Sequence, residues 1–331
     1  MTDRPVFVVG APRTGTTLMM EILNRHPEIH LFDEVHFFER IWDERHAIGD
    51  LAQPGPRADA FARLRDTVQR FGRDQAVAGV LDDAEFARRL AAEGGGYRGL
   101  MAALMKAGAE LHGAIRWGDS SPQDVLYAAQ ILDWFPEARI IGIVRDPRGF
   151  LASYKNYWRR GVASYRERYN PLANALLWRS YMRALLRLSA GEHRRAVLVV
   201  RYEDLVSDPE RHVRSFCEHL GVPFEPAMLE VDATNTSFPG QKAKGIVSTS
   251  VDRWRTELTA TEIRLGERIF GGTMRQLGYE PRGKSAGPLS VPELLRTLAV
   301  LPGRLFNILF RTGKPLTLAK VRRVLSSLRA D

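Results

Sequence analysis

One short segment near the amino terminus constrains the fold more than any other, because it places a glycine loop between an apolar run and a helix-like run. The segment reads VFVVGAPRTGTTLMMEIL, with Gly10 and Gly15 at the two ends of the loop. A strand, a glycine loop and a helix N-terminus in this order form a phosphate-binding cradle. Loops that bind nucleoside triphosphates carry lysine after the second glycine, but this chain has Thr16 there, and Arg13 is the only cation of the loop. The loop therefore predicts an anion site of a different kind.

The charge distribution argues against some classes of function. The 331-residue chain has a net charge of +9, and residues 281–331, with ten Lys or Arg against two acidic residues, carry +8 of it. The nearly neutral remainder argues against a nucleic-acid-binding protein. One cysteine, Cys217, allows no intrachain disulfide, and residues 2–5 leave no room for a signal peptide, so we expect a cytoplasmic location. No apolar run approaches the roughly 20 residues of a membrane span.

Short apolar runs alternate with helix-like segments along most of the chain. Four runs have the length and composition of buried parallel strands, at residues 6–9, 29–32, 140–144 and 197–200. Six segments have helical spacing, at residues 16–25, 123–135, 149–160, 174–188, 209–220 and 261–277. The alternation predicts an α/β fold in which helices flank both faces of a parallel sheet.

The predicted strands all end in residues that can take part in chemistry, and ligands bind beyond the carboxyl ends of the strands in such a sheet. The first strand ends at the glycine loop and the second at Asp33 and Glu34. The third ends at residues 145–148, which include two arginines, and the fourth at residues 201–204, which include Tyr202. This set suits a nucleotide together with a hydroxyl acceptor that must lose a proton.

Four segments, in their order along the chain, resemble motifs of the sulfotransferases that use 3′-phosphoadenosine 5′-phosphosulfate (PAPS). GAPRTGTTLM is similar to their 5′-phosphosulfate loop, in the arginine form of protein-tyrosine sulfotransferases and many bacterial relatives. RDPRGFLASY is similar to their 3′-phosphate motif, and VRYEDLVSDP and LGYEP are similar to further family segments. The resemblance covers about residues 5–281. It implies a PAPS-dependent enzyme with a P-loop-type sheet and no metal, whose second product is adenosine 3′,5′-bisphosphate.

The resemblance also implies which residues contact PAPS. Arg13, with the loop backbone, would hold the 5′-phosphate and neutralise charge on the leaving group, Arg145 and Ser153 would hold the 3′-phosphate, and Tyr202 would contact adenine. A flexible basic stretch would fold over the donor. Simpler readings remain open: a turn arginine, an Arg145–Asp146 pair, a core tyrosine and solvated lysines. The expected contacts are Arg13, Thr14, Gly15, Thr16, Thr17, Arg145, Ser153, Tyr202, Lys242, Lys244 and Gly245.

Glu34 is the expected general base. It follows Arg13 by 21 residues, and its segment FDEVHFF falls where the protein-tyrosine sulfotransferases carry their glutamate base. A right-handed βαβ connection would place its strand beside or near the first strand, so that Glu34 and Arg13 face one site. Asp33 and His36 are the alternative bases, and a structural role for each of the three residues also remains open.

One position departs from the family pattern. Many relatives carry a lysine in a G-x-K-[ST]-P segment, and its charge helps the leaving group, whereas residues 118–122 read GDSSP with Ser120 in its place. Three alternatives follow. Either Arg13 stabilises the leaving group alone, or Arg116 or a lysine of residues 242–244 takes the place of the missing lysine, or activity is reduced or lost. The rival functions are a metal-dependent kinase of the same fold and a non-catalytic protein that binds membrane surfaces.

The acceptor is not revealed by the sequence. Residues 1–281 are expected to form the α/β domain, with the helical region 37–115 and the loop 159–170 facing the acceptor. Five nearby aromatic residues either stack on an acceptor ring or belong to the core: Tyr154, Tyr157, Trp158, Tyr165 and Tyr169.

A basic helical extension is expected at residues 282–331. Residues 291–329 interleave apolar and basic residues as helices at anionic membrane surfaces do, and Pro302 and Gly303 are expected to break the first helix. The same pattern fits helices that pack on the body, cover the acceptor cleft or form a dimer contact. A membrane location would favour a lipid-like acceptor.

Overall fold

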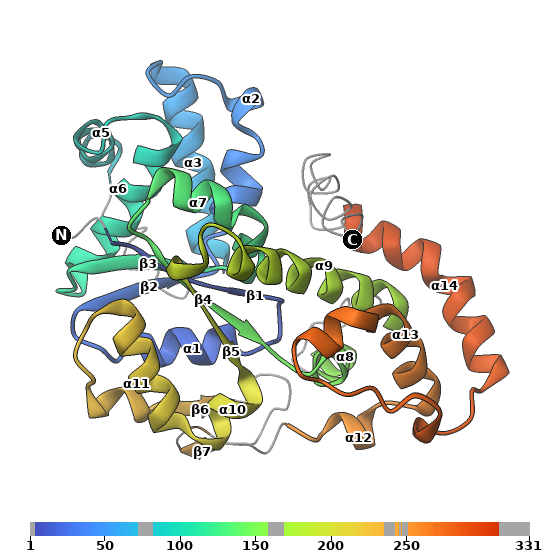
Figure 1. Ribbon diagram of the computed structural model, residues 1–331. Coiled ribbons are helices and arrows are strands. Elements are labelled where there is room, and N and C mark those ends of the chain that lie inside the picture. Colours follow the sequence, from blue (N-terminus) through green and yellow to red (C-terminus); the bar gives the residue numbers. More distant parts are fainter. Residues whose placement is uncertain are drawn as a thin grey trace.

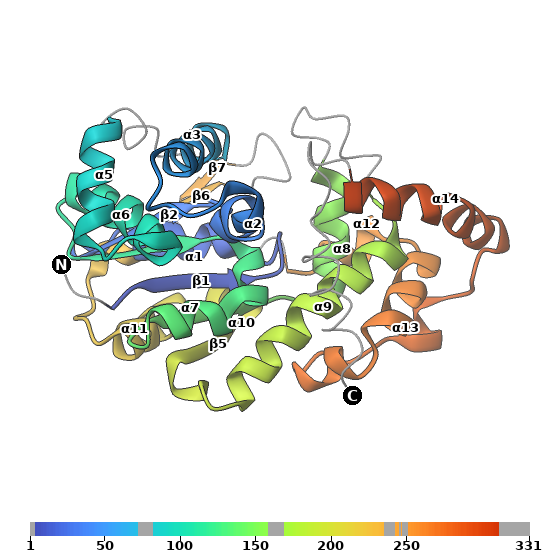
Figure 2. The ribbon, with the colours of Figure 1, turned by 90° about the horizontal axis from the view of Figure 1, so that it is seen from above.

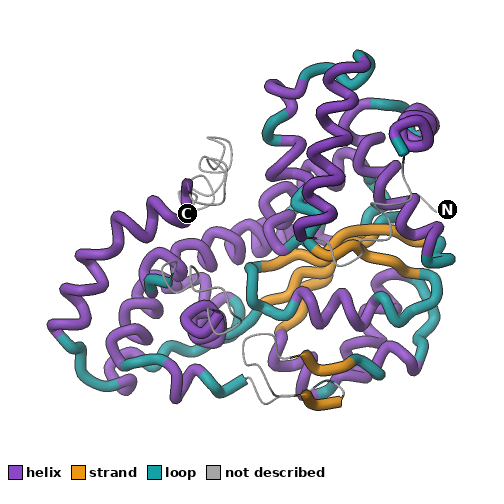
Figure 3. Tube along the Cα trace, turned by 180° about the vertical axis from the view of Figure 1, so that it is seen from behind, coloured by secondary structure: helices purple, strands orange, loops and turns teal. Residues whose placement is uncertain are grey.

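A single five-stranded parallel sheet forms the centre of the protein (Figure 1). The computed structural model describes residues 4–71, 82–157, 169–234, 242–244, 246 and 251–310. The strand order is β2-β3-β1-β4-β5, and Figure 3 shows the sheet from behind with helices around it. The predicted α/β class is confirmed. The strands are β1 Val6–Gly10, β2 Ile29–Asp33, β3 Arg116–Ser120, β4 Arg139–Val144 and β5 Val197–Arg201.

Strand β3 is absent from the predicted set, and it lies between β1 and β2. Its sequence, RWGDS, contains one large apolar residue, so its hydropathy does not indicate a buried strand, although all five residues are buried. Gly118 permits the close approach of β1, because a Cβ atom there would lie 1.7 Å from the carbonyl oxygen of Val6. The predicted proximity of β2 to β1 is therefore achieved across one intervening strand.

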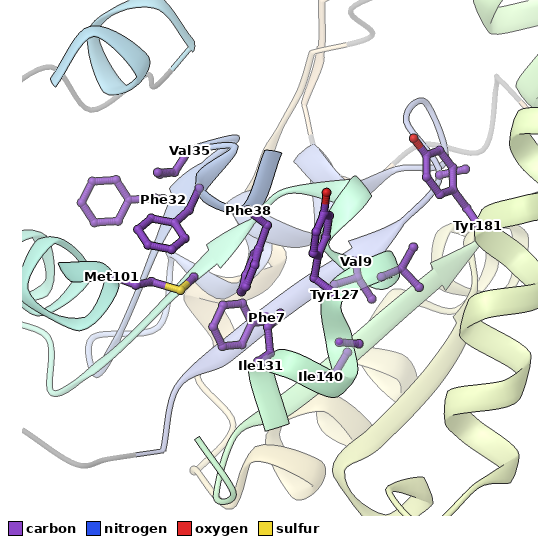
Figure 4. Packing of buried hydrophobic residues seen from close by; sticks show 14 of the residues in the cluster. Phe7, Val9, Phe32, Val35, Phe38, Met101, Tyr127, Ile131, Ile140 and Tyr181 are labelled. Carbon is purple, nitrogen blue, oxygen red and sulfur yellow. The ribbon is translucent and has the colours of Figure 1, made fainter. Parts of the chain in front are cut away.

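Helices cover both faces of the sheet, as predicted. Because successive side chains of a strand point to opposite faces, β1 sends Val6 and Val8 into one core and Phe7 and Val9 into the other. Figure 4 shows Phe7 and Val9 with residues of the larger core. The smaller core is closed by α1 Thr16–Leu23, α10 Tyr202–Ser207 and α11 Pro209–Leu220, and the larger by α6 Gly96–Leu111, α7 Ala128–Trp134 and α9 Pro171–Ala190.

Two further groups of helices lie around the sheet, one above it in Figure 1 and the other to its right, and Figure 2 shows the two groups from above. A 3₁₀-helix, Pro122–Tyr127, precedes α7, so the helix predicted at residues 123–135 is two elements. None of the helices within the described ranges is both long and apolar enough to cross a bilayer. The first group contains α2 Arg45–Ile48, α3 Pro54–Phe71 and α5 Asp83–Ala92. The second contains α8 Pro147–Asn156, α12 Trp254–Glu257, α13 Ala260–Gln276 and α14 Val291–Phe310. Strand β6 Asp232–Thr234 pairs antiparallel with β7 Lys242–Lys244.

Helix α14 packs on the body of the protein. The Asn170 side-chain amide donates a hydrogen bond of 3.0 Å to the Thr297 carbonyl, and the Thr259 hydroxyl donates one of 2.5 Å to Glu293. The expected break at Pro302 is wrong, because α14 continues through it without the hydrogen bond that the missing N–H would donate. The remaining basic tail, residues 311–331, lies outside the described residues.

Candidate active site

The glycine loop joins β1 to α1 and leaves the N-terminus of α1 able to receive an anion. Gly15 is the residue before the helix, with φ of +112°, and no described side chain caps the helix N-terminus. A Cβ atom on Gly15 would lie 2.6 Å from a ring carbon of Tyr202, so glycine is required both for the backbone conformation and for space. The N–H groups of the first turn and the helix dipole both favour negative charge here.

Four predicted donor-site residues meet around this helix N-terminus. Arg13 Nε donates a hydrogen bond of 3.2 Å to the Ser153 hydroxyl, although 140 positions separate the two residues in the chain. Arg145 donates to the Arg13 carbonyl at 3.4 Å, and its guanidinium lies 4.4 Å from the ring centre of Tyr202. Arg13, with φ of +73°, also stacks at 4.5 Å on Tyr157. Two cations, a hydroxyl and two aromatic rings therefore converge on the loop.

A buried ion network anchors the segment that carries Arg145. Asp146 caps α8 by accepting a hydrogen bond from the Arg148 backbone N–H, and its carboxylate also pairs with the Arg148 guanidinium at 2.6 Å. Arg148 in turn contacts Glu267 of α13 at 3.3 Å and stacks on Trp254 at 4.1 Å. The Asp146 carboxylate thus contacts Arg148, whereas Arg145 contacts the Arg13 carbonyl and the Tyr202 ring.

The three expected bases lie at the end of β2 and directly after it, and two of them have a strained backbone. Glu34 and His36 have φ of +49° and +52°, a region that residues other than glycine rarely adopt. His36 Nδ1 lies 3.1 Å from Glu39, and its Nε2 lies 3.5 Å from Glu34. The Glu34 side chain is 39% exposed and that of His36 11%, so Glu34 is the more accessible to an acceptor. Asp33 ends β2, in register with Ser120 of β3.

Comparison with known proteins identifies the family. The model of the sulfotransferase family matches residues 5–226, more than half of the chain. The chain belongs to the sulfotransferase family. It is 29% identical over 307 residues to the nodulation protein NoeE of Sinorhizobium fredii, across 83% of this chain and 65% of NoeE, so it spans less than two thirds of that relative.

Two further comparisons concern a relative in sequence and a relative in fold. Protein-tyrosine sulfotransferase 1 of Danio rerio is 24% identical over 301 residues, which cover 84% of this chain and 73% of that protein. The sulfotransferase domain from the Synechococcus PCC 7002 olefin synthase has the same fold, with a TM-score of 0.53 and 23% identity over 81% of this chain and 94% of that domain.

The position that departs from the sulfotransferase pattern is buried. The Ser120 hydroxyl points toward the Thr16 carbonyl at 3.4 Å and carries no charge. Arg116 does not substitute for the missing lysine, because it begins β3 at the opposite end of the strand and donates to the Leu220 carbonyl at 2.6 Å. The side chains of Lys242 and Lys244, and all of Gly245, lie outside what the structure describes.

Arg253 is a further cation of the site that the sequence motifs do not indicate. Burial lowers the pKa of Arg253, the neighbouring Glu257 raises it, and the repulsion of the Arg145 guanidinium lowers it. Arg253 therefore lies within electrostatic range of Arg145. The signal in the sequence is an arginine directly before Trp254, whose buried ring supports Arg148. Among the aromatic residues proposed for the acceptor, Tyr157 reaches Arg13, Tyr154 and Tyr169 pack on the larger core, and Trp158 and Tyr165 lie outside the described residues.

Replacing Arg148 with Met tests whether the ion network supports this site. The change leaves Asp146 and Glu267 buried without their counter-charge, so the free energy of unfolding is expected to fall by about 3–5 kcal/mol. Arg65→Met, which removes the exposed pair with Asp83, is the control and is expected to cost at most about 1 kcal/mol. Urea denaturation gives both values, and equal losses would contradict an anchoring role for Arg148.

Proposed function

We propose that this protein is an enzyme that transfers a sulfuryl group from PAPS to a hydroxyl group. The carrying observation is the contact of Arg13 with Ser153 at 3.2 Å, beside Arg145 and Tyr202, at an N-terminus of α1 that no described side chain caps. Two cations and a helix N-terminus suit a ligand with separate anionic groups, and an aromatic face suits its base. Membership of the sulfotransferase family supports a sulfuryl rather than a phosphoryl donor.

The donor-binding residues divide between the two anionic ends of PAPS. The backbone N–H groups of residues 14–17 and the Arg13 guanidinium hold the 5′-phosphosulfate, and Arg145 and Ser153 hold the 3′-phosphate. Tyr202 packs on adenine. Arg253 adds a third positive charge near Arg145, and the stretch with Lys242, Lys244 and Gly245 covers the donor.

The proposed reaction is an in-line displacement at sulfur. Glu34 accepts the proton of the acceptor hydroxyl while the acceptor oxygen forms a bond to sulfur. The bond between sulfur and the 5′-phosphate oxygen breaks, and its electron pair stays on that oxygen. Arg13 stabilises the resulting negative charge. It thereby performs the role of the family lysine, whose position is occupied by Ser120 in this chain. The products are the sulfated acceptor and adenosine 3′,5′-bisphosphate.

Binding of nucleotides separates this proposal from the kinase and tests Arg145. Adenosine 3′,5′-bisphosphate is expected to raise the melting temperature of the protein, whereas ATP with Mg²⁺ is not, because ATP lacks a 3′-phosphate. Arg145→Ala is expected to weaken the binding of adenosine 3′,5′-bisphosphate by about 10- to 100-fold, because a charged hydrogen bond is lost. The same change is expected to alter the affinity for 5′-AMP little. Both affinities are measured by calorimetry. Arg139→Ala, which removes an arginine at the other end of β4, is the control and is expected to change neither affinity. Similar losses for both nucleotides would make Arg145 structural, and preference for ATP with Mg²⁺ would favour the kinase.

Replacement of Glu34 tests its role as the general base. Glu34→Gln is expected to preserve the fold and the affinity for adenosine 3′,5′-bisphosphate but to lower turnover by about 10²-fold or more, because the amide cannot accept the proton. Turnover is measured as transfer of label from [³⁵S]PAPS to an extract of the source organism. Glu28→Gln, at the opposite end of β2, is the matched control. Normal turnover of the Glu34 variant would move the base to His36 or Asp33.

We also propose that the carboxyl-terminal region binds an anionic membrane surface. Val291, Leu295 and Leu298 recur at helical spacing on α14 and are 63%, 61% and 47% exposed, while Thr297 faces α9. The chain continues from this apolar stripe into residues 311–331, which carry six Lys or Arg against one acidic residue. Apolar side chains beside a basic segment match a lipid interface, and a lipid-like acceptor would then lie near the site.

Vesicle binding tests the membrane proposal without removing α14 from the body. The full-length protein is expected to co-sediment with vesicles of phosphatidylglycerol and phosphatidylcholine, and less so as the salt concentration rises. Replacing Val291, Leu295 and Leu298 together by Ser should lower binding at least about fivefold, because the apolar contribution is lost. The control replaces Leu111 and Ile115, which are 45% and 44% exposed on another surface. Equal binding by both variants would exclude the α14 stripe as the contact.

A further inference from the structure

Two buried carboxyl groups lie beneath the base segment and take no part in the proposed reaction. Asp119 is on β3, next to Ser120, and Asp124 is in the 3₁₀-helix that follows; their exposed fractions are 0% and 1%. Asp119 Oδ2 and both oxygens of Asp124 receive no hydrogen bond from any described donor when both groups are ionised. Buried carboxylate oxygens without donors are costly, so the pair needs a proton.

Asp119 is linked by two hydrogen-bonding routes to the backbone of the base segment, residues 33–36. The Val35 N–H donates to Asp119 Oδ1 at 3.4 Å. The His36 N–H donates to the Ser121 hydroxyl at 3.2 Å, and Ser121 in turn hydrogen-bonds the Asp119 carboxylate. Two consecutive N–H groups are therefore tied to one carboxylate, directly and through one hydroxyl.

The tied residues lie where the backbone is strained. Val35 stands between Glu34 and His36, which both have positive φ. Such conformations cost roughly 1–3 kcal/mol each and persist only where the surroundings enforce them. The hydrogen bonds to Asp119 on β3 and to Ser121, the residue after β3, hold this backbone from outside its own segment.

The charges around the pair assign the proton. Burial raises the pKa of Asp119 to about 6, and burial together with the neighbouring Asp119 raises the pKa of Asp124 further above its ordinary value. Asp33 and His36 also act electrostatically on Asp119, and His36 acts on Asp124. Glu34 and Glu39 lie on either side of the His36 ring. At neutral pH Asp124 holds the proton, and its hydroxyl can donate to ionised Asp119.

We propose that Asp119, held as a carboxylate by a proton on Asp124, is the positioning residue that sets the Glu34 side chain toward the acceptor. The carboxylate is the common acceptor for the Val35 N–H, the Ser121 hydroxyl and the Asp124 hydroxyl. Its effect on the reaction rests on the proposed function, whereas the shared proton and the anchoring of the segment do not.

Isosteric substitutions distinguish the two carboxyl groups. Asp124→Asn keeps a donor toward Asp119, so the Val35 and His36 amides are expected to exchange with solvent deuterons at nearly the wild-type rate. Asp119→Asn has one acceptor oxygen for three donors, so both amides are expected to exchange at least about 10-fold faster, the cost of one lost hydrogen bond. Ser121→Ala, which breaks one branch, should accelerate His36 more than Val35 and serves if Asp119→Asn does not fold.

Carbon NMR of ¹³C-labelled aspartate reads the proton directly. The Asp124 carboxyl carbon, assigned by its loss in Asp124→Asn, is expected at the shift of a protonated carboxyl group at pH 7. Turnover of Asp119→Asn should fall at least about 10-fold with unchanged affinity for adenosine 3′,5′-bisphosphate, because donor binding does not use this segment. An ionised Asp124 at pH 7, or equal amide exchange in the Asp119 and Asp124 variants, overturns the proposal. Absence of sulfuryl transfer by the wild type would refute the proposed function and leave the NMR and exchange tests in force.

Discussion

Positive charge gathered at the N-terminus of α1 is the constraint on which the rest of the site depends. Arg13 and Arg145 bring two guanidinium groups to a helix end that is itself positive, and Arg253 adds a third nearby. Like charges repel, so each cation needs partners that hold it in place. The ring faces of Tyr157 and Tyr202 and the Ser153 hydroxyl supply such partners. An anionic ligand is the natural complement of the whole arrangement.

The support for these cations lies one layer below the site, in buried ion pairs. Asp146, Arg148 and Glu267 join α8 to α13, and Glu203 extends the network by accepting hydrogen bonds from the Asp146 N–H at 2.9 Å and the Tyr279 hydroxyl at 2.7 Å. Buried charges of this kind are costly to separate, so they hold the Arg145 segment rigid. The family resemblance of VRYEDLVSDP and LGYEP has a physical basis here, because these two segments meet through Glu203 and Tyr279.

Carboxyl groups gather on the other side of β1, at the ends of β2 and β3. Glu34, Asp119 and Asp124 lie there, and Gly118 allows β3 to fit closely between β1 and β2. The sheet therefore separates an anion-binding half, formed at β1, β4 and β5, from an acidic half that can accept a proton. A donor with a good leaving group and an acceptor with a hydroxyl would meet at this boundary.

Local sequence determined the elements whose physical cause is local. The apolar runs of β1, β2, β4 and β5, the glycine loop and the spacing of Arg145 and Ser153 were all readable, because burial and helix periodicity leave a signal within a few residues. The polar strand β3 was not, since its burial depends on Gly118 meeting β1 and on partners for Asp119 that come from the segment after β2. The meeting of Arg13 with Ser153, the exclusion of Arg116 and the place of Arg253 were likewise decided only by the tertiary structure. These contacts join residues that are far apart in the chain, and no local pattern encodes which distant surfaces will pack together.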